Sequence, residues 1–67
     1  MRFVIEIVRR GDIGAPYLLY RAPSYAFSSK RARVKARRLL DAYHAHGANA
    51  VRITNGNGLE LYSWWRH

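Results

Sequence analysis

Hydrophobic and polar side chains alternate along three stretches of the chain, at residues 1–10, 50–54 and 59–65. A period of two places successive side chains on opposite faces of a β-strand, and the β-branched and aromatic residues found here are favoured in strands. A further short strand is expected over residues 17–21, paired with the first as a hairpin. The pattern therefore predicts four strands.

The chain between the two strand pairs has a helical period instead. A helix is expected from Ser28 or Ser29 to His46, with one of those serines as its N-cap; Ser24 is a competing cap that would start the helix one turn earlier. Gly47 suits the left-handed conformation that commonly follows a helix. The apolar side chains of this segment recur as a single stripe, formed by Ala32, Ala36, Leu39, Leu40 and Tyr43.

These elements predict an α+β fold in the order β-β-α-β-β, with one helix packed on one face of a four-stranded, mostly antiparallel sheet. The 67 residues suffice for a single small domain, residues 1–67. The sequence Asn55-Gly56-Asn57-Gly58 is typical of a hairpin turn between the last two strands. The pattern leaves the strand order open. The residues expected to face the helix are Phe3, Ile5, Ile7, Val51, Ile53, Leu59, Leu61 and Trp65.

The other face of the sheet is expected to be open, partly apolar and partly cationic. Either Tyr17 with Leu19 or Leu18 with Tyr20 could be the core pair of the second strand, so one of these tyrosines would join the open face. Two interpretations follow: nucleic-acid bases stack on the rings while arginines hold phosphates, or the apolar patch is the interface of a homodimer. The remaining residues expected on this face are Val4, Val8, Tyr62, Trp64, Arg2, Arg52 and Arg66.

The net charge of the chain is +8 and its isoelectric point is about 10.9, and ten of its 12 cationic residues are arginines. A strongly basic domain favours polyanions, and arginine suits bidentate phosphate contacts. The chain contains no cysteine, which excludes disulfides and thiolate metal sites. It lacks a basic leader before an apolar run and any apolar stretch of about 20 residues, so we expect a cytoplasmic location and no membrane partner.

Half of the cationic residues lie in the segment from Lys30 to Arg38, on the expected helix. Cations near a helix N-terminus are unfavourable by roughly 0.3–1 kcal/mol each, so folding alone does not explain this placement. A phosphate at the helix start would explain it; the alternative is a solvated face whose long side chains shield the edges of the core. The candidate nucleic-acid-binding residues are Lys30, Arg31, Arg33, Lys35, Arg37 and Arg38, with Arg52, Tyr62 and Trp64 as a secondary surface.

Catalytic and metal-binding patterns are not found in the sequence. His44 and His46 are two residues apart and would not face each other on a helix. The four carboxylates, Glu6, Asp12, Asp41 and Glu60, are scattered over separate elements. We therefore expect a small non-enzymatic nucleic-acid-binding protein without cofactor, metal or small-molecule substrate. The alternative is a protein–protein interaction module or a homodimer that uses the open sheet face.

Overall fold

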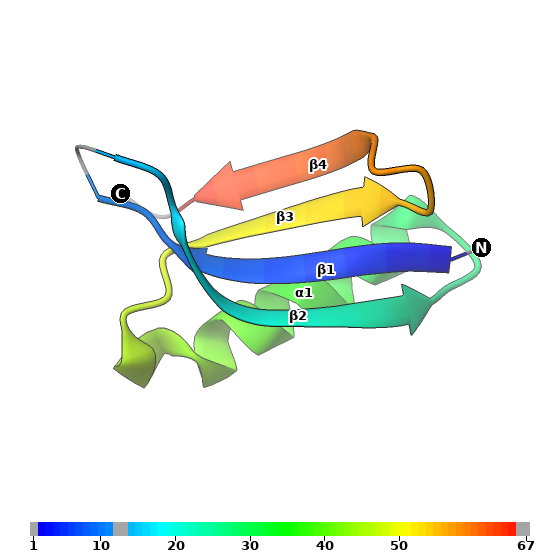
Figure 1. Ribbon diagram of the computed structural model, residues 1–67. Helices are drawn as coiled ribbons and strands as arrows, with labels where there is room; N and C mark the ends of the chain where they lie inside the picture. The colour runs from blue at the N-terminus through cyan, green and yellow to red at the C-terminus, as the bar shows by residue number, and fades with distance from the viewer. Residues whose placement is uncertain (1, 12–13, 66–67) are drawn as a thin grey trace.

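The structure, a computed structural model, describes residues 2–11 and 14–65 and confirms the α+β fold (Figure 1). All three strand pairs are antiparallel and the strand order is β2-β1-β3-β4, so β1 and β3 are central and β2 and β4 are the edges. The expectations for Asp12 and Arg66 fall outside the described residues. The elements are β1 (Arg2–Arg9), β2 (Tyr17–Tyr25), α1 (Ser29–Ala42), the 3-10 turn η1 (His44–His46), β3 (Ala50–Asn55) and β4 (Glu60–Trp65).

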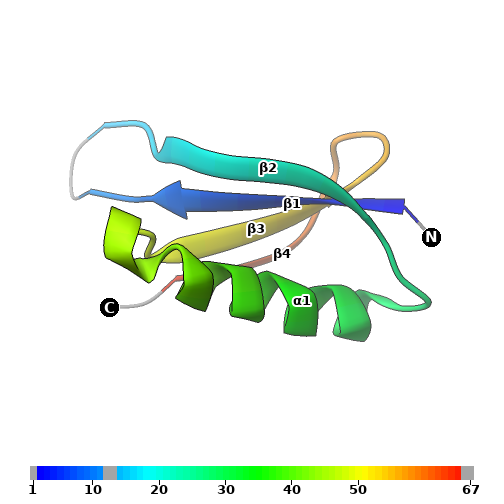
Figure 2. The ribbon, with the colours of Figure 1, turned by 90° about the horizontal axis from the view of Figure 1, so that it is seen from below.

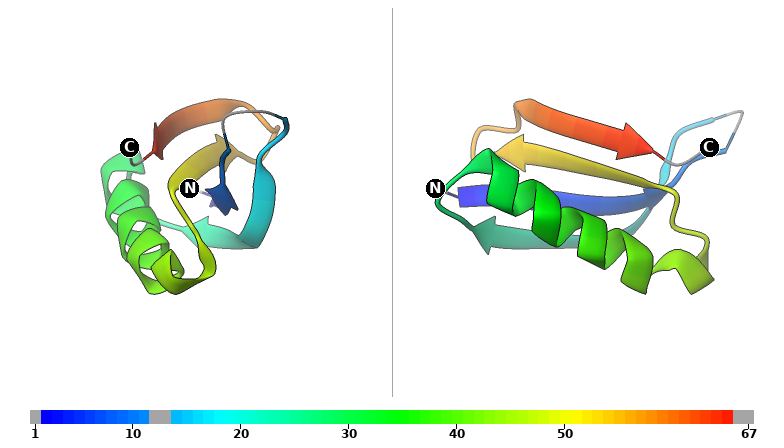
Figure 3. Two further views of the ribbon diagram at one scale, coloured as in Figure 1. Left: turned by 90° about the vertical axis from the view of Figure 1, so that its left-hand side faces the viewer. Right: turned by 180° about the vertical axis from the view of Figure 1, so that it is seen from behind.

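Helix α1 lies across one face of the sheet and leaves the other face open (Figures 2 and 3). The predicted helical stripe is confirmed: Ala32, Ala36 and Leu40 are buried, and Leu39 and Tyr43 pack against them. The small side chains of the two alanines let the helix backbone approach the sheet closely. Full burial of a large aliphatic or aromatic side chain contributes about 1.5–3 kcal/mol, and the inner face of the central strands carries five such side chains. Its fully buried side chains are Phe3, Ile5, Ile7, Val51 and Ile53.

The start of α1 follows the sequence prediction, and its end does not. Ser28 is the N-cap, and its hydroxyl accepts a hydrogen bond from the amide of Arg31 at 3.3 Å. Beyond Ala42 the chain tightens into η1, so the α-helix is shorter than the sequence predicted, and Gly47 then adopts a left-handed conformation with φ of 86°. Ser24 is not a cap, because β2 runs on through Pro23. A proline is tolerated there because β2 is an edge strand.

The predicted facing of β4 is wrong. A β-bulge between Ile53 and Thr54 shifts the pairing of β3 with β4, so that Tyr62 lies opposite Ile53 and Trp64 lies opposite Val51. Directly opposed residues share a face of the sheet, and Tyr62 and Trp64 therefore face the helix and pack against the core. Three residues expected in the core are exposed instead: Leu59, Leu61 and Trp65.

A second bulge settles the facing of β2. The pairing with β1 shifts between Ile7 and Val8, which places Tyr20 opposite Ile7 and Leu18 opposite Val8. Tyr20 is on the helix side, where its ring stacks on Tyr43 with ring centres 5.1 Å apart. Leu18 is on the open face. Tyr17 lies opposite Arg9, which is on the same face of β1 as Ile7, so, contrary to the expectation, neither tyrosine joins the open face.

Candidate nucleic-acid interface

The six cationic side chains of α1 are all exposed. They project outward because the opposite face of the helix, formed by Ala32, Ala36 and Leu40 at intervals of four residues, is buried against the sheet. The first turn of α1 contains no acidic residue and its last turn contains no basic residue, so the charges oppose the helix dipole as the sequence indicated. The outer face of α1, which is turned away from the sheet in Figure 3, therefore carries all six of these cations.

Two of these arginines lie on aromatic rings of β4. The guanidinium carbon of Arg33 is 4.6 Å from the ring centre of Tyr62, and that of Arg37 is 3.9 Å from the ring centre of Trp64. Four residues of helix advance about 6 Å and two residues of strand advance about 6.6–6.8 Å, so the two pairs can stack in register. Each cation–π contact contributes about 0.5–1 kcal/mol at an exposed site. These contacts fasten α1 to the edge strand and hold two guanidinium groups one helical turn apart.

The arginines that lie on β4 also line a shallow hollow beside the helix. It has a volume of about 490 Å³ and is lined by Lys30, Arg33, Val34, Arg37, Arg38, Asp41 and Tyr62. This side of α1 therefore carries four cations, Lys30, Arg33, Arg37 and Arg38. One carboxylate, Asp41, lies at its far end.

A second hollow, of about 370 Å³, lies where β2 leads into α1. Arg31 and Lys35 line it together with Phe27, whose side chain is 90% exposed. The guanidinium carbon of Arg31 is 5.8 Å from the centre of that ring. Ser24 also lines the hollow, and its buried hydroxyl has no hydrogen-bond partner among the described residues. Cations thus flank the helix start on both sides, although the Ser28 hydroxyl already occupies the amide of Arg31.

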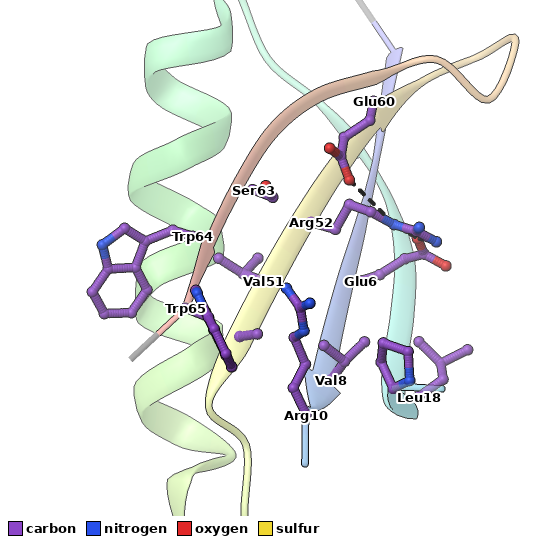
Figure 4. A pocket seen from close by; sticks show the side chains of 12 residues that line it. Glu6, Val8, Arg10, Leu18, Val51, Arg52, Glu60, Ser63, Trp64 and Trp65 are labelled. Carbon is purple, nitrogen blue, oxygen red and sulfur yellow. Dashed lines mark hydrogen bonds and ion pairs between the residues drawn. The ribbon is translucent and has the colours of Figure 1, made fainter. Parts of the chain in front are cut away.

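The secondary surface expected from Arg52, Tyr62 and Trp64 is not a single surface. Arg52 lies opposite Glu6 and Ser63 on the open face, whereas both rings lie on the helix side of the sheet. The Arg52 Nε donates to Glu6 Oε1 at 2.7 Å, and Glu6 is buried. Figure 4 shows the separation: Arg52 lies beside Glu60 and Glu6, and Trp64 points away toward the helix. The rings cannot act with Arg52 as a base-stacking platform.

A cation–π pair on the open face was missed by the sequence analysis. The guanidinium carbon of Arg10 lies 4.4 Å from the ring centre of Trp65, which was expected in the core (Figure 4). The Asn49 side chain fixes the backbone of Arg10. The amide of Arg10 donates to Asn49 Oδ1 at 2.7 Å, and Asn49 Nδ2 donates to the Arg10 carbonyl at 2.8 Å. The sequence pattern could not predict this pair, because the β3–β4 bulge decides which face of the sheet Trp65 is on.

The described part of the chain gathers no set of three or more metal-ligating side chains. Glu6, Asp41 and Glu60 lie on β1, α1 and β4, and Glu6 and Glu60 both pair with Arg52. Within residues 2–11 and 14–65, no helix is long and apolar enough to cross a bilayer. No protein-family model matches the chain, and no curated protein or solved structure matches it either.

Proposed function

We propose that this protein binds nucleic acid through the exposed face of α1, with the helix cations contacting phosphates. The observation that carries the proposal is the stacking of Arg33 on Tyr62 and of Arg37 on Trp64. An arginine held on a ring loses less side-chain freedom when it binds an anion than a fully mobile one, so these contacts lower the entropic cost of a phosphate contact. The six residues proposed to contact phosphates are Lys30, Arg31, Arg33, Lys35, Arg37 and Arg38.

The placement of the charge supports the same proposal. Lys30, Arg31 and Arg33 occupy the first turns of α1, where the helix dipole disfavours them. The like charges at Arg33 and Arg37, four residues apart, also repel each other. A bound phosphate would relieve both effects, and the first amides of a helix are suited to an anion. The arrangement is therefore costly for the free protein and favourable for a complex with a polyanion.

The proposed contacts are to the sugar–phosphate backbone. Tyr62 and Trp64 have one ring face covered by guanidinium groups, so we assign them to positioning the arginines rather than to stacking on bases. Arg52 is left out of the proposed interface because it is paired with Glu6 on the opposite face. Binding of this kind is largely independent of sequence and depends steeply on salt, because each neutralised phosphate releases counterions.

A fluorescence-anisotropy titration against labelled duplex DNA and single-stranded RNA, at 50 and 200 mM salt, tests the proposal. For six phosphate contacts we expect the affinity for duplex DNA to fall by about a thousandfold between the two salt concentrations. An uncharged peptide nucleic acid of the same sequence is the matched control and should not bind. Absence of binding at 50 mM salt, or binding with no salt dependence, would overturn the proposal.

A further inference from the structure

Charges of alternating sign cross the open face of the sheet from one edge to the other. Arg21 on β2 lies 3.9 Å from Glu6 on β1, Glu6 pairs with Arg52 on β3, and Arg52 lies 4.0 Å from Glu60 on β4. The order of the signs across the four strands is therefore plus, minus, plus, minus. The side chains of Arg21, Arg52 and Glu60 are each at least half exposed.

An apolar row runs parallel to this charged row. Leu18, Val8, Ala50 and Trp65 lie side by side, one from each strand in the same order. Leu18 is 47% exposed and Trp65 is 39% exposed, at the two edges of the sheet. Between them is a hollow of about 360 Å³, to which all four strands contribute (Figure 4). Arg10, which stacks on Trp65, also lines this hollow.

We propose that two copies of this chain pair through their open sheet faces about a two-fold axis that runs along the strands. Rotation about such an axis reverses the strand order, so that β2 lies over β4 of the second copy and β1 lies over β3. Arg21 then faces Glu60 of the second copy, and Glu6 faces Arg52 of the second copy. A row with alternating signs on four strands is thus complementary to itself in this orientation.

The apolar row is matched by the same rotation. Trp65 lies over Leu18 of the second copy, where it enters the hollow, and Val8 lies over Ala50 of the second copy. A two-fold axis perpendicular to the strands would instead place Arg21 against Arg21 and Glu6 against Glu6. Like charges in contact are unfavourable, so the pattern selects one of the two face-to-face orientations. The strands of the two sheets would run nearly aligned, as in other packed pairs of sheets.

The size of the face determines how tight the dimer is. Four strands about 4.8 Å apart and about six residues long present roughly 400 Å² per copy. This is about half the area per partner of a standard specific interface, so we expect a weak, reversible dimer with a dissociation constant in the micromolar range. The helices stay on the outer faces, so the proposal does not depend on nucleic-acid binding.

Charge reversal at the rim tests the orientation directly. Arg21→Glu and Glu60→Arg alone each place two like-charged pairs across the interface, whereas a mixture of the two variants restores two opposite-charged pairs. By sedimentation velocity at 0.15 M salt, where most long-range repulsion is screened, we expect each variant alone to dissociate at least tenfold more readily than the unchanged protein. The mixture should recover the dimer.

Two further variants separate the interface from the fold. Trp65→Ser should weaken the dimer by at least tenfold, and Val34→Ser, which removes an exposed apolar side chain from the helix face, should leave it unchanged. Circular dichroism confirms that each variant is folded. Sedimentation of the unchanged protein as a monomer at 500 μM would overturn the proposal. A dimer that survives both reversals, or that the mixture fails to restore, would also overturn it.

Discussion

The guanidinium carbon of Arg37 lies 3.9 Å from the ring centre of Trp64, and this contact joins the most basic element of the chain to an edge strand. A cation that would otherwise be mobile in solvent is thereby given a fixed position. The neighbouring pair of Arg33 and Tyr62 repeats the contact one helical turn away. The two pairs stabilise the packing of α1 on the sheet. They also hold the guanidinium groups of Arg33 and Arg37 at fixed positions.

The Arg37–Trp64 contact should be measurable as a coupling energy. In a double-mutant cycle with Arg37→Gln and Trp64→Leu, we expect about 0.5–1 kcal/mol of coupling in the free energy of unfolding, measured by urea denaturation. Arg38 is the matched control, because it is also an exposed arginine of α1 and contacts no aromatic ring among the described residues. Its cycle with Trp64 should give a coupling near zero. Equal coupling in the two cycles would show that the stacking contributes nothing specific.

The carboxylate of Glu6 should matter more for stability than that of Glu60. Glu6 is buried, accepts a hydrogen bond from Arg52 and forms an ion pair with it, whereas Glu60 is half exposed and lies 4.0 Å from the same arginine. Glu6→Gln should lower the free energy of unfolding by about 1–3 kcal/mol, and Glu60→Gln should lower it by less than about 0.5 kcal/mol. Urea denaturation of the two variants checks the difference. Similar losses would show that the buried Arg52–Glu6 pair adds no more stability than the exposed Arg52–Glu60 pair.

The Ser28 cap should be visible in the stability of the helix. Ser28→Ala removes the acceptor for the Arg31 amide and should cost about 1 kcal/mol. Ser29→Ala, one residue inside the helix, is the matched control and should cost less. Helical circular dichroism during thermal unfolding reports both, and a larger loss for Ser29→Ala would rule out the capping role.

Lys30 should show opposite effects on stability and on binding. Lys30→Glu places an acidic side chain in the first turn of α1, where the helix dipole favours it, and should raise the free energy of unfolding by about 0.3–1 kcal/mol. The same change should weaken DNA binding, because it adds repulsion at the proposed phosphate site. Lys30→Gln, which only removes the charge, should have a stability and a DNA affinity between those of the unchanged protein and of Lys30→Glu. If Lys30→Glu lowers stability, or leaves DNA binding unchanged, the argument from charge placement fails.

The sequence predicted the helix and the two central strands because in each of them only one side is apolar enough to be buried in the core. In α1 the stripe of Ala32, Ala36 and Leu40 is flanked by cations, so only one side can be buried. In β4 both alternating sets contain large apolar side chains, and either Leu61 or Tyr62 could pair with Ile53 on the core face. A single bulged residue decides between them and turns every side chain of the strand over.

The part of the candidate site on α1 could be predicted from the sequence, and the part on β4 could not. The six cations of α1 are exposed as expected, because their facing follows from the helical stripe. The assignment of Tyr62 and Trp64 to the open face was wrong, because it depended on the facing of β4. Their contacts with Arg33 and Arg37 also require that a helical turn and two strand residues advance by similar distances. A pattern within one element does not contain that relationship.

The central claim is that the helix face, and not the net charge as a whole, binds nucleic acid. The most direct test compares two double variants that remove the same charge, Arg33→Gln with Arg37→Gln on the helix and Arg2→Gln with Arg9→Gln on β1. For each, the affinity for duplex DNA is measured across salt concentrations. The helix variant should reduce the slope of log affinity against log salt by about 2, and the β1 variant should leave it near that of the unchanged protein. Equal reductions in the two slopes would contradict the claim.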